Sequence, residues 1–425
     1  MDNNRKTAYR VLLAMEEKGA YSNLELNSRI EKDQPDSPAF VREIVYGVTE
    51  NRIYIDFTLD YFIKKGVKSA DPKVLTLMRM AVYQVEFMDS VPEYAAINES
   101  VKLAKKFARG RDGFVNGVLR NYLRKRDQVK LPSREKDLAG YLSIKYSVHR
   151  SIAELWLQQM GEDRTERMLK WGNTRPELMI RVNYLKTTVE QLQNILENQG
   201  FQVTQSEICS RTLVVKGSGL LDIDLYRQGY FSVQDVTSTI AAEMLQPQPG
   251  DFVIDMCAAP GGKTACIAEI MENRGRIQAF DIYSHKVKLI DDNAKRLGIT
   301  IIQAQERDSS IPFEDSEKAD RVLCDVPCSG LGMIRQKPEI KFRAVENQGI
   351  ELSNLQLTIL ENGAQRLKKG GRLVYSTCTL NYNENQKVIE RFLRDHKDMK
   401  LVCEKVFSPE DACNGFFAAA LEKNI

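Results

Sequence analysis

Apolar residues recur at helical spacing through the first 130 residues. Between Ala8 and Met15 they fall three or four positions apart, and the same spacing returns from Val74 to Val85. Asp71-Pro72 precedes that second stretch as a helix start, with Pro in the first turn. The pattern predicts an all-helical N-terminal part that ends near Leu131-Pro132.

Between Leu178 and Tyr230 the apolar runs become shorter, and strand-like and helix-like spacings follow one another. Residues 179–183 alternate like a strand, 189–199 form a helical pattern ended by Gly200, and two further short apolar runs follow. A small α+β module is the simplest interpretation.

From Gln246 onward short apolar strands alternate with helical segments. Strands are expected at 252–255, 276–281, 301–304, 321–325 and 371–376. This rhythm predicts a parallel sheet with helices on both faces, an α/β Rossmann-like fold. The chain is therefore expected to be multidomain, with a helical domain over 1–135, linker helices and a small α+β module over 136–230, and an α/β domain over 231–425.

Composition narrows the class of protein. The chain has 425 residues, of which 43% are hydrophobic and 28% charged, and its 61 basic and 58 acidic residues leave a net charge of +3. A polycation is excluded, so any basic surface must be local. No apolar run approaches the roughly 20 residues of a membrane span, and the N-terminus lacks the apolar core of a signal peptide. Eight cysteines and three histidines predict a cytoplasmic protein with reduced thiols, without a disulfide scaffold or a zinc site.

One local basic surface is present. Residues 101–126 contain nine basic side chains and one acidic side chain. Lys102, Lys105, Lys106 and Arg109 have the spacing of one helix face, Arg120 and Arg124 follow on a second helix, and Gly110 and Gly113 separate the two. A solvated helix face and an RNA- or DNA-phosphate surface both remain open.

A glycine-rich turn follows the first strand of the α/β part. Its sequence from Asp255 to Thr264 is neither a Walker A loop nor G-x-G-x-x-G, so it is not shaped for a pyrophosphate. The next strand ends at Asp281, where a carboxylate can bind ribose hydroxyls. The arrangement favours an adenosine-containing ligand without a diphosphate, such as S-adenosyl-L-methionine. The alternative is that Gly261 and Gly262 only make a tight turn and that Asp281 caps a helix.

Two cysteines follow two strands of the same predicted sheet. Cys328 lies in 325–332 and Cys378 in 376–379, and parallel strands direct their carboxyl ends to one ligand-binding edge. A thiol nucleophile is the functional interpretation. Most cysteines are buried small hydrophobic residues, and this alternative covers Cys209, Cys266, Cys324, Cys403 and Cys413.

At these motifs the sequence resembles the RNA cytosine carbon-5 methyltransferases, and closely the bacterial Sun/Fmu branch that acts on 16S ribosomal RNA. The resemblance covers about residues 170–425 and rests on five motifs, which are Asp-x-Cys-Ala-Ala-Pro-Gly-Gly-Lys-Thr from Asp255, Asp-x-Pro-Cys-Ser-Gly from Asp325, Ser-Thr-Cys-Thr from Ser376, 231–235 and 415–417. The helical part, above all 114–120, resembles the NusB-like RNA-binding domain that this branch carries.

The resemblance implies an S-adenosyl-L-methionine-dependent methyltransferase domain behind an RNA-binding α+β module. It implies that Cys378 attacks carbon 6 of the cytosine and that Cys328 assists release of the product. Asp325 would contact the base and the methionine end of the cofactor, and Lys263 would lie near the active site. The implied cofactor residues are Cys257, Ala258, Ala259, Pro260, Gly261, Gly262, Lys263, Asp281 on the ribose, Asp308 near the adenine, and Asp325. A helix-cap role for Asp308 stays open.

Two positions depart from the family pattern, Asn414 where Asp is frequent and Gln336 where a basic residue is frequent. The implied partner is 16S ribosomal RNA, naked or in an early small-subunit particle, with no metal, membrane or obligate protein partner. The alternatives are a transfer RNA cytosine methyltransferase, a non-catalytic antitermination-type RNA-binding factor, and a thiol-dependent dehydrogenase. The missing phosphate loop disfavours the dehydrogenase.

Overall fold

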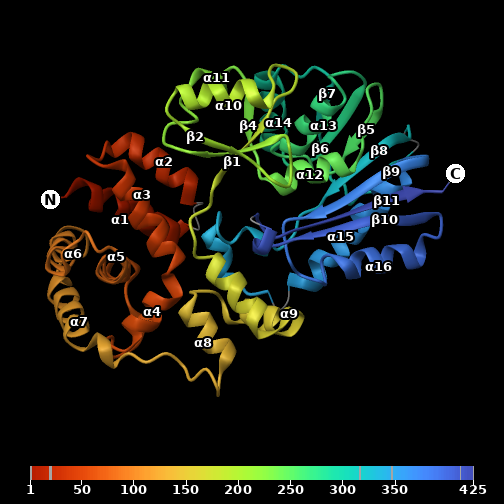
Figure 1. Ribbon diagram of the computed structural model, residues 1–425. Helices are drawn as coiled ribbons and strands as arrows, with labels where there is room; N and C mark the ends of the chain where they lie inside the picture. Colours follow the sequence, from red (N-terminus) through yellow and green to blue (C-terminus); the bar gives the residue numbers. More distant parts are fainter. Residues whose placement is uncertain (1, 19–21, 315–316, 346–347, 412, 425) are drawn as a thin grey trace. The chain divides into compact units, whose positions relative to one another are not determined.

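A computed structural model describes residues 2–18, 22–314, 317–345, 348–411 and 413–424 (Figure 1). The chain forms two compact units. One contains residues 1–173 together with 336–344, and the other contains 174–335 together with 345–425. None of the helices in the described ranges combines the length and the hydropathy that a membrane span needs.

The first unit is helical, as predicted. Its main helices are α1 (Asn3–Lys18), α2 (Ser22–Asp33), α3 (Pro38–Glu50), α4 (Arg52–Asp60), α5 (Pro72–Phe87), α6 (Glu93–Phe107), α7 (Asp112–Lys125), α8 (Leu138–Lys145) and α9 (Arg150–Trp171). The carboxylate of Asp71 caps α5 by accepting the Lys73 N–H at 2.8 Å. Helix α5 is buried from Val74 to Gln84 and contacts α1, α3, α4, α6 and α7, so it forms the centre of this unit.

A segment from the C-terminal half of the sequence also belongs to this unit. The 3-10 helix Pro338–Phe342 packs against α3. Its Lys341 is fully buried and donates to the Glu50 carbonyl at 3.2 Å and to Asn173 Oδ1 at 2.5 Å. Burial lowers the pKa of Lys341 to about 8. Compactness thus groups α8, α9 and this segment with the helical domain, whereas the sequence suggested a boundary at residue 135.

The second unit begins with the predicted α+β module. Its elements are β1 (Leu178–Val182), α10 (Val189–Asn198), β2 (Gln202–Gln205), β3 (Thr212–Lys216), α11 (Asp224–Arg227) and β4 (Phe231–Val233). The four strands form an antiparallel sheet in the order β2-β3-β1-β4. Thr188 and Gln191 make a reciprocal capping box at the start of α10.

A seven-stranded sheet follows, in the order β10-β11-β9-β8-β5-β6-β7. Its strands are β5 (Phe252–Asp255), β6 (Arg276–Asp281), β7 (Ile302–Glu306), β8 (Ala319–Asp325), β9 (Leu367–Thr377), β10 (Met399–Phe407) and β11 (Phe416–Lys423). Figure 1 shows α12 (Val236–Met244), α13 (Gly262–Ile270) and α14 (Ser284–Leu297) over one face, and α15 (Gln348–Gln365) and α16 (Gln386–Asp395) over the other.

The prediction of a wholly parallel sheet was incomplete. Strands β5 to β9 pair in parallel, but β11 pairs antiparallel with both β9 and β10. Strand β11 is buried from Phe416 to Leu421, so it lacks the alternation that marks a half-buried strand. Cys403 on β10 is exposed, so its assignment as a buried small hydrophobic residue was wrong.

Candidate active site

Three neighbouring parallel strands end at the same edge of the sheet and bring the motif residues together. Strand β5 ends at Asp255, β8 at Asp325 and β9 at Thr377, and β8 pairs with both of the others. Asp325 lies opposite Ser376 in the β8–β9 register. The loop that carries Cys328 therefore starts beside the loop that carries Cys378. This edge is where ligands bind in such sheets.

The two cysteines meet across these loops. Cys328 Sγ and Cys378 Sγ are 3.3 Å apart, and both side chains are partly buried and free of disulfides. The Ser329 and Thr379 hydroxyls lie 2.9 Å apart, which ties the two loops a second time. The structure thus brings Cys328 and Cys378 into one site.

A close backbone approach supports this pair. The Gly332 N–H donates to the Cys378 carbonyl at 3.0 Å. A Cβ atom on Gly332 would come within 1.8 Å of the Gly415 carbonyl oxygen. Glycine is therefore required where the Cys328 loop passes the start of β11.

Lys263 and Asp325 form an ion pair beside the cysteines. Lys263 Nζ lies 2.8 Å from Asp325 Oδ2, and the Ser376 hydroxyl donates to Asp325 Oδ1 at 2.7 Å. Burial tends to lower the pKa of Lys263, but the charge and hydrogen bond of Asp325, together with the charge of Cys378, raise it above its ordinary value. Lys263 is therefore a fixed cation at this edge.

The Cys328 thiol holds its proton strongly. The pKa of Cys328 lies well above its ordinary value because its side chain hydrogen-bonds to Cys378 and is buried. The Cys328 thiol can therefore act as a proton donor toward Cys378.

The glycine-rich turn joins β5 to α13 directly beside the ion pair. Gly261 has a left-handed φ of 95°, and a Cβ atom there would come 3.2 Å from Ile290 Cα. The buried Asp255 carboxylate accepts the Thr264 hydroxyl at 2.7 Å, and burial raises the pKa of Asp255 to about 7. The turn ends at the N-terminus of α13, which begins at Gly262.

Two further carboxylates stand at the same edge. Asp281 ends β6 and is buried, with Oδ1 accepting the Tyr283 N–H at 3.2 Å, while Ile282 beside it is 49% exposed. Asp308 follows β7, and its Oδ1 accepts the Ser310 N–H at 2.9 Å. Both carboxylates accept hydrogen bonds, and Ile282 offers an exposed apolar surface next to Asp281. Such acceptors fit the ribose hydroxyls and the adenine amino group of an adenosyl ligand.

A buried ion pair connects the small α+β module to helix α13, which follows this turn. Arg181 on β1 and Glu269 on α13 are both fully buried, with Arg181 Nη2 and Glu269 Oε1 2.7 Å apart. Arg181 Nη1 also donates to the Gly262 carbonyl at 2.7 Å, at the end of the glycine-rich turn. The module is thereby joined to the glycine-rich turn itself.

Sequence reasoning missed Arg181 and Ser376. It also missed Glu384, whose carboxylate accepts the Ser329 N–H at 2.8 Å. A signal existed for Arg181, which is a charged residue at the centre of an apolar strand. Ser376 is the first residue of the Ser-Thr-Cys-Thr motif, but the sequence predicted no role for it. Glu384 is buried next to the cysteine loops, in a polar run just before an amphipathic helix.

Comparison with known proteins decides the family. The model described as "16S rRNA methyltransferase RsmB/F" matches residues 242–421, the NusB family matches 2–124, and an RsmF/B-like ferredoxin-like domain matches 152–221. A Bacillus subtilis protein named probable ribosomal RNA small subunit methyltransferase B is 36% identical over 93% of this chain and 89% of its own. A Synechocystis protein of the same name is 32% identical over 98% and 95%.

This chain belongs to the RsmB/F family of methyltransferases. The solved structure of PH0851 has a TM-score of 0.84 with it, at 30% identity over 99% of this chain and 98% of the other. NSun6 from Pyrococcus horikoshii, solved with SFG, shares the fold at a TM-score of 0.60 and 23% identity, over 65% of this chain and 98% of its own.

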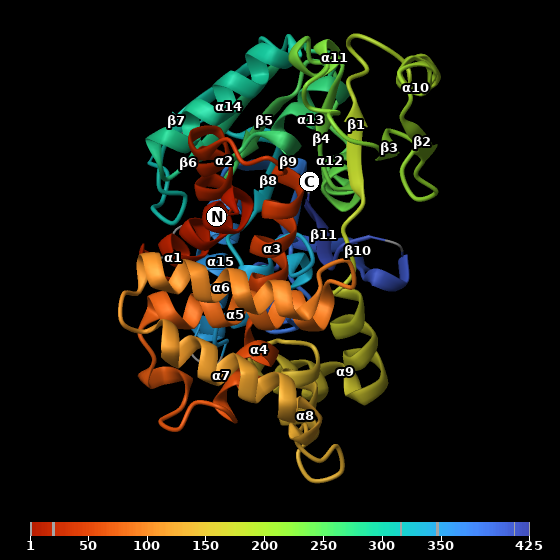
Figure 2. The same ribbon diagram turned by 90° about the vertical axis from the view of Figure 1, so that its left-hand side faces the viewer.

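Within the NusB-matched part of this RsmB/F-family chain, the predicted basic residues are all exposed. Figure 2 shows α6 and α7 running beside one another, and contacts between them agree. Two details of the prediction were wrong. Arg109 does not share the helix face of Lys102, because α6 ends at Phe107. Gly113 does not separate the two helices, because it lies inside α7. Lys102 is paired with Glu99 at 2.6 Å, whereas Arg120 and Arg124 bond only neutral amides among their described hydrogen bonds.

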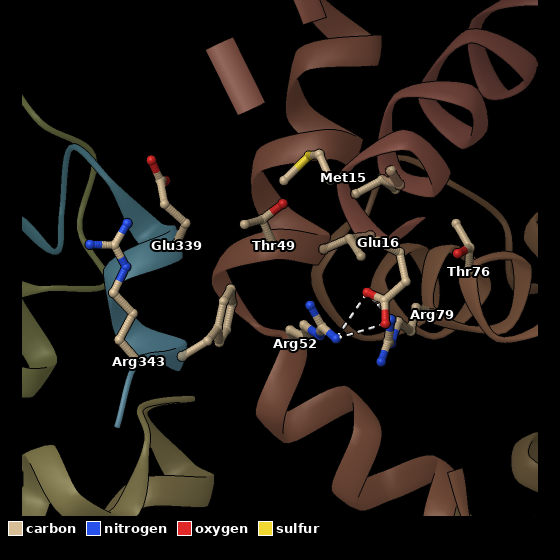
Figure 3. A pocket seen from close by; sticks show the side chains of 11 residues that line it. Met15, Glu16, Thr49, Arg52, Thr76, Arg79, Glu339 and Arg343 are labelled. Atoms are coloured by element: carbon tan, nitrogen blue, oxygen red, sulfur yellow. Dashed lines mark hydrogen bonds and ion pairs between the residues drawn. The ribbon is translucent and has the colours of Figure 1, made fainter. Parts of the chain in front are cut away.

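A cavity of about 190 Å³ lies in the helical unit (Figure 3). Its walls include two arginines already engaged by carboxylates. Arg79 binds Asp56 at 2.6 and 2.7 Å and Glu16 at 3.1 Å, and Arg52 binds Glu16 at 2.9 Å. These guanidinium groups are neutralised, which disfavours the cavity as a phosphate site.

The departure at Asn414 has a structural explanation. Asn414 is buried, and its Nδ2 donates to Asp235 Oδ2. Asp235 caps α12 by accepting the Thr237 N–H at 3.0 Å. An amide at position 414 satisfies the second oxygen of this cap, where a carboxylate would add a like charge.

Proposed function

We propose that this protein transfers a methyl group from S-adenosyl-L-methionine to carbon 5 of a cytosine in 16S ribosomal RNA, through a covalent adduct between cysteine and carbon 6. The observation that carries the proposal is the 3.3 Å separation of Cys328 Sγ and Cys378 Sγ beside the Lys263–Asp325 pair. Relatives named as small subunit methyltransferases over most of this chain support the RNA substrate.

The chemistry needs an activated thiolate, because carbon 5 of cytosine is a poor nucleophile. The Cys378 thiolate forms a bond to carbon 6, and the electron pair of the 5,6 double bond makes carbon 5 enamine-like. The Lys263 ammonium lies close enough for its pKa to respond to Cys378, so it stabilises the thiolate form. Asp325 is placed by Lys263 and Ser376 to hydrogen-bond the ring edge.

When bound, S-adenosyl-L-methionine supplies an electrophilic methyl group. The residues that would hold it are those of the turn from Cys257 to Lys263, with Asp281 at the ribose and Asp308 at the adenine. Asp325, which ends β8, would contact the methionine end and the base. Because the base must reach the sulfur of Cys378, we expect the target base to be flipped out of any stack.

Release requires the carbon 6–sulfur bond to break. The proton on carbon 5 leaves, its electron pair restores the 5,6 double bond, and Cys378 departs. Cys328 can give its proton to the departing sulfur over 3.3 Å and accept the carbon 5 proton in exchange. One proton per turnover then passes to solvent as Cys378 ionises again.

The test is covalent trapping. Cys328→Ala protein incubated with 16S ribosomal RNA and S-adenosyl-L-methionine is expected to give a protein–RNA band on a denaturing gel, because Cys378 still attacks but release is blocked. Cys403→Ala is the matched control, since Cys403 is an exposed cysteine on the edge strand β10. It should turn over normally without a band.

The double variant Cys328→Ala/Cys378→Ala should lose the band. A band that persists in the double variant, or its absence from Cys328→Ala while the unmodified protein methylates the same RNA, would contradict these cysteine roles. If 16S ribosomal RNA is not methylated at all and transfer RNA is, the substrate part of the proposal is wrong.

The basic face of α6 and α7 is proposed to bind RNA phosphates. It consists of Lys102, Lys105, Lys106, Arg120 and Arg124, together with Arg109 in the loop between the helices. Arg120→Glu/Arg124→Glu is expected to weaken RNA binding at low salt. The slope of log affinity against log salt should fall by roughly 1 per lost contact. Filter binding across a salt series measures both.

Arg394→Glu/Lys397→Glu provides the control, because it makes the same change in charge at exposed positions at the end of α16. It should leave the slope unchanged. Equal slopes for the two double variants would show that net charge alone matters and would remove this surface from the proposal.

A further inference from the structure

Glu384 is a fully buried carboxylate that the chemistry above does not use. It lies in the turn between β9 and α16, six residues after Cys378. Burying a carboxylate is costly unless hydrogen bonds replace its hydration. Its position and its partners therefore indicate what it does.

The carboxylate of Glu384 joins the two cysteine loops. Its Oε2 accepts the main-chain N–H of Ser329 at 2.8 Å, and Ser329 directly follows Cys328. Its Oε1 accepts Asn381 Nδ2 at 2.9 Å, three residues beyond Cys378. One side chain thus holds a main-chain group of the first loop and a side chain of the second.

Gln356 on α15 completes the clamp. Its Nε2 donates to Glu384 Oε2 at 3.0 Å and to the Pro327 carbonyl at 2.9 Å. The Cys328 loop is therefore held at a main-chain group on each side of Cys328, through Pro327 and Ser329. These bonds fix where the Cys328 sulfur lies relative to Cys378.

We propose that Glu384, together with Gln356, is a positioning residue for the release step, holding the Cys328 sulfur against Cys378. The inference rests on the proposed function and deepens it. The clamp holds the main-chain groups on both sides of Cys328, which acts when the adduct breaks down, whereas the attacking Cys378 directly follows the last residue of strand β9. The negative charge of Glu384 also adds to the raised pKa of Cys328, after the hydrogen bond to Cys378 and burial.

Glu384→Gln tests this directly. The amide keeps one acceptor oxygen and turns the other position into a donor, so it cannot accept both the Ser329 N–H and the Asn381 amide, and the bridge between the two cysteine loops is broken. We expect a kcat about 10–100-fold lower, since small misplacements of reacting groups have effects of that size. The KM for RNA should change little, and the covalent adduct should accumulate in the steady state, as in Cys328→Ala. Single-turnover adduct formation should stay within about threefold of the unmodified protein.

Two further variants separate positioning from loss of stability. Gln356→Met removes the amide and keeps the buried carboxylate, and it should also accumulate adduct. Ile389→Val weakens the packing of α16 without touching either loop, since Ile389 is a buried core residue. It should accumulate none. Circular dichroism checks that each variant is folded. If Glu384→Gln does not fold, the accumulation of adduct in Gln356→Met decides whether the positioning role holds.

The results distinguish this inference from the proposed function. If Cys328→Ala traps adduct while Glu384→Gln and Gln356→Met turn over without accumulating it, the positioning role is wrong. Equal slowing of adduct formation and release in both variants would also overturn it. If Cys328→Ala itself traps nothing from a methylated RNA, the proposed cysteine chemistry fails, whatever Glu384 does.

Discussion

Replacing Cys378 with alanine is expected to lower methyl transfer by about 10⁴-fold or more, because covalent nucleophiles that are removed typically cost this much. The loss should appear in kcat, since the thiolate acts on bound base and contributes little to binding. RNA affinity and cofactor affinity should stay within about twofold. Methyl transfer from labelled cofactor to 16S ribosomal RNA measures the rate, and filter binding and calorimetry measure the affinities.

Cys403→Ala is again the control for removal of a cysteine as such, because its side chain is exposed on the edge strand. Cys378→Ser offers a graded comparison, as its hydroxyl keeps the shape of the site but ionises far less readily than a thiol. Full turnover in Cys378→Ala would exclude the covalent mechanism. A loss that appears wholly as weaker RNA binding would make Cys378 a binding residue.

The second large effect is expected at the buried Arg181–Glu269 pair. Arg181→Met leaves the Glu269 carboxylate buried without its partner, and breaking such a pair costs about 3–5 kcal/mol of unfolding free energy. The double variant Arg181→Met/Glu269→Leu removes both charges and should recover at least half of the loss, since apolar replacement of a buried pair is often neutral. Because Arg181 also holds the Gly262 carbonyl, both variants should bind the cofactor more weakly.

The two units allow the effect to be located. Both tryptophans, Trp156 and Trp171, lie in α9 of the helical unit. Tryptophan fluorescence therefore follows that unit, and calorimetry follows both. The Arg181→Met variant should move the calorimetric transition of the second unit and leave the fluorescence transition in place. A shift in fluorescence alone would contradict the assignment.

The loss in Arg181→Met should also depend on pH. Burial already raises the pKa of Glu269, against the lowering effect of Arg181. Without Arg181 the folded-state pKa rises further above the unfolded value, so the unfolded chain binds fewer protons and stability falls as pH rises. The variant should therefore be closer to the unmodified protein at pH 5 than at pH 8. An effect independent of pH would mean that lost packing, not the unpaired charge, is the cause.

The sequence by itself determined the local elements and the motif turns. Strand β5, strand β6 and the end of strand β8 lie where their apolar patterns predict, because burial of one face or both faces leaves a local period in the chain. It also located the turn from Asp255 to Thr264 between a strand and a helix, since a strand, small residues and a helix start are all local features.

Only the tertiary structure decided which distant residues meet. Cys328 and Cys378 are 50 positions apart, and their 3.3 Å contact follows from the pairing of β8 with β9. The burial of Glu384 between their loops and of Lys341 inside the helical unit leaves no period in the sequence, because a polar side chain becomes buried only when distant chain segments supply its partners. The sequence did not predict the antiparallel strand β11 for a related reason. Both of its faces are covered by segments far away in the chain, so its residues do not alternate between buried and exposed.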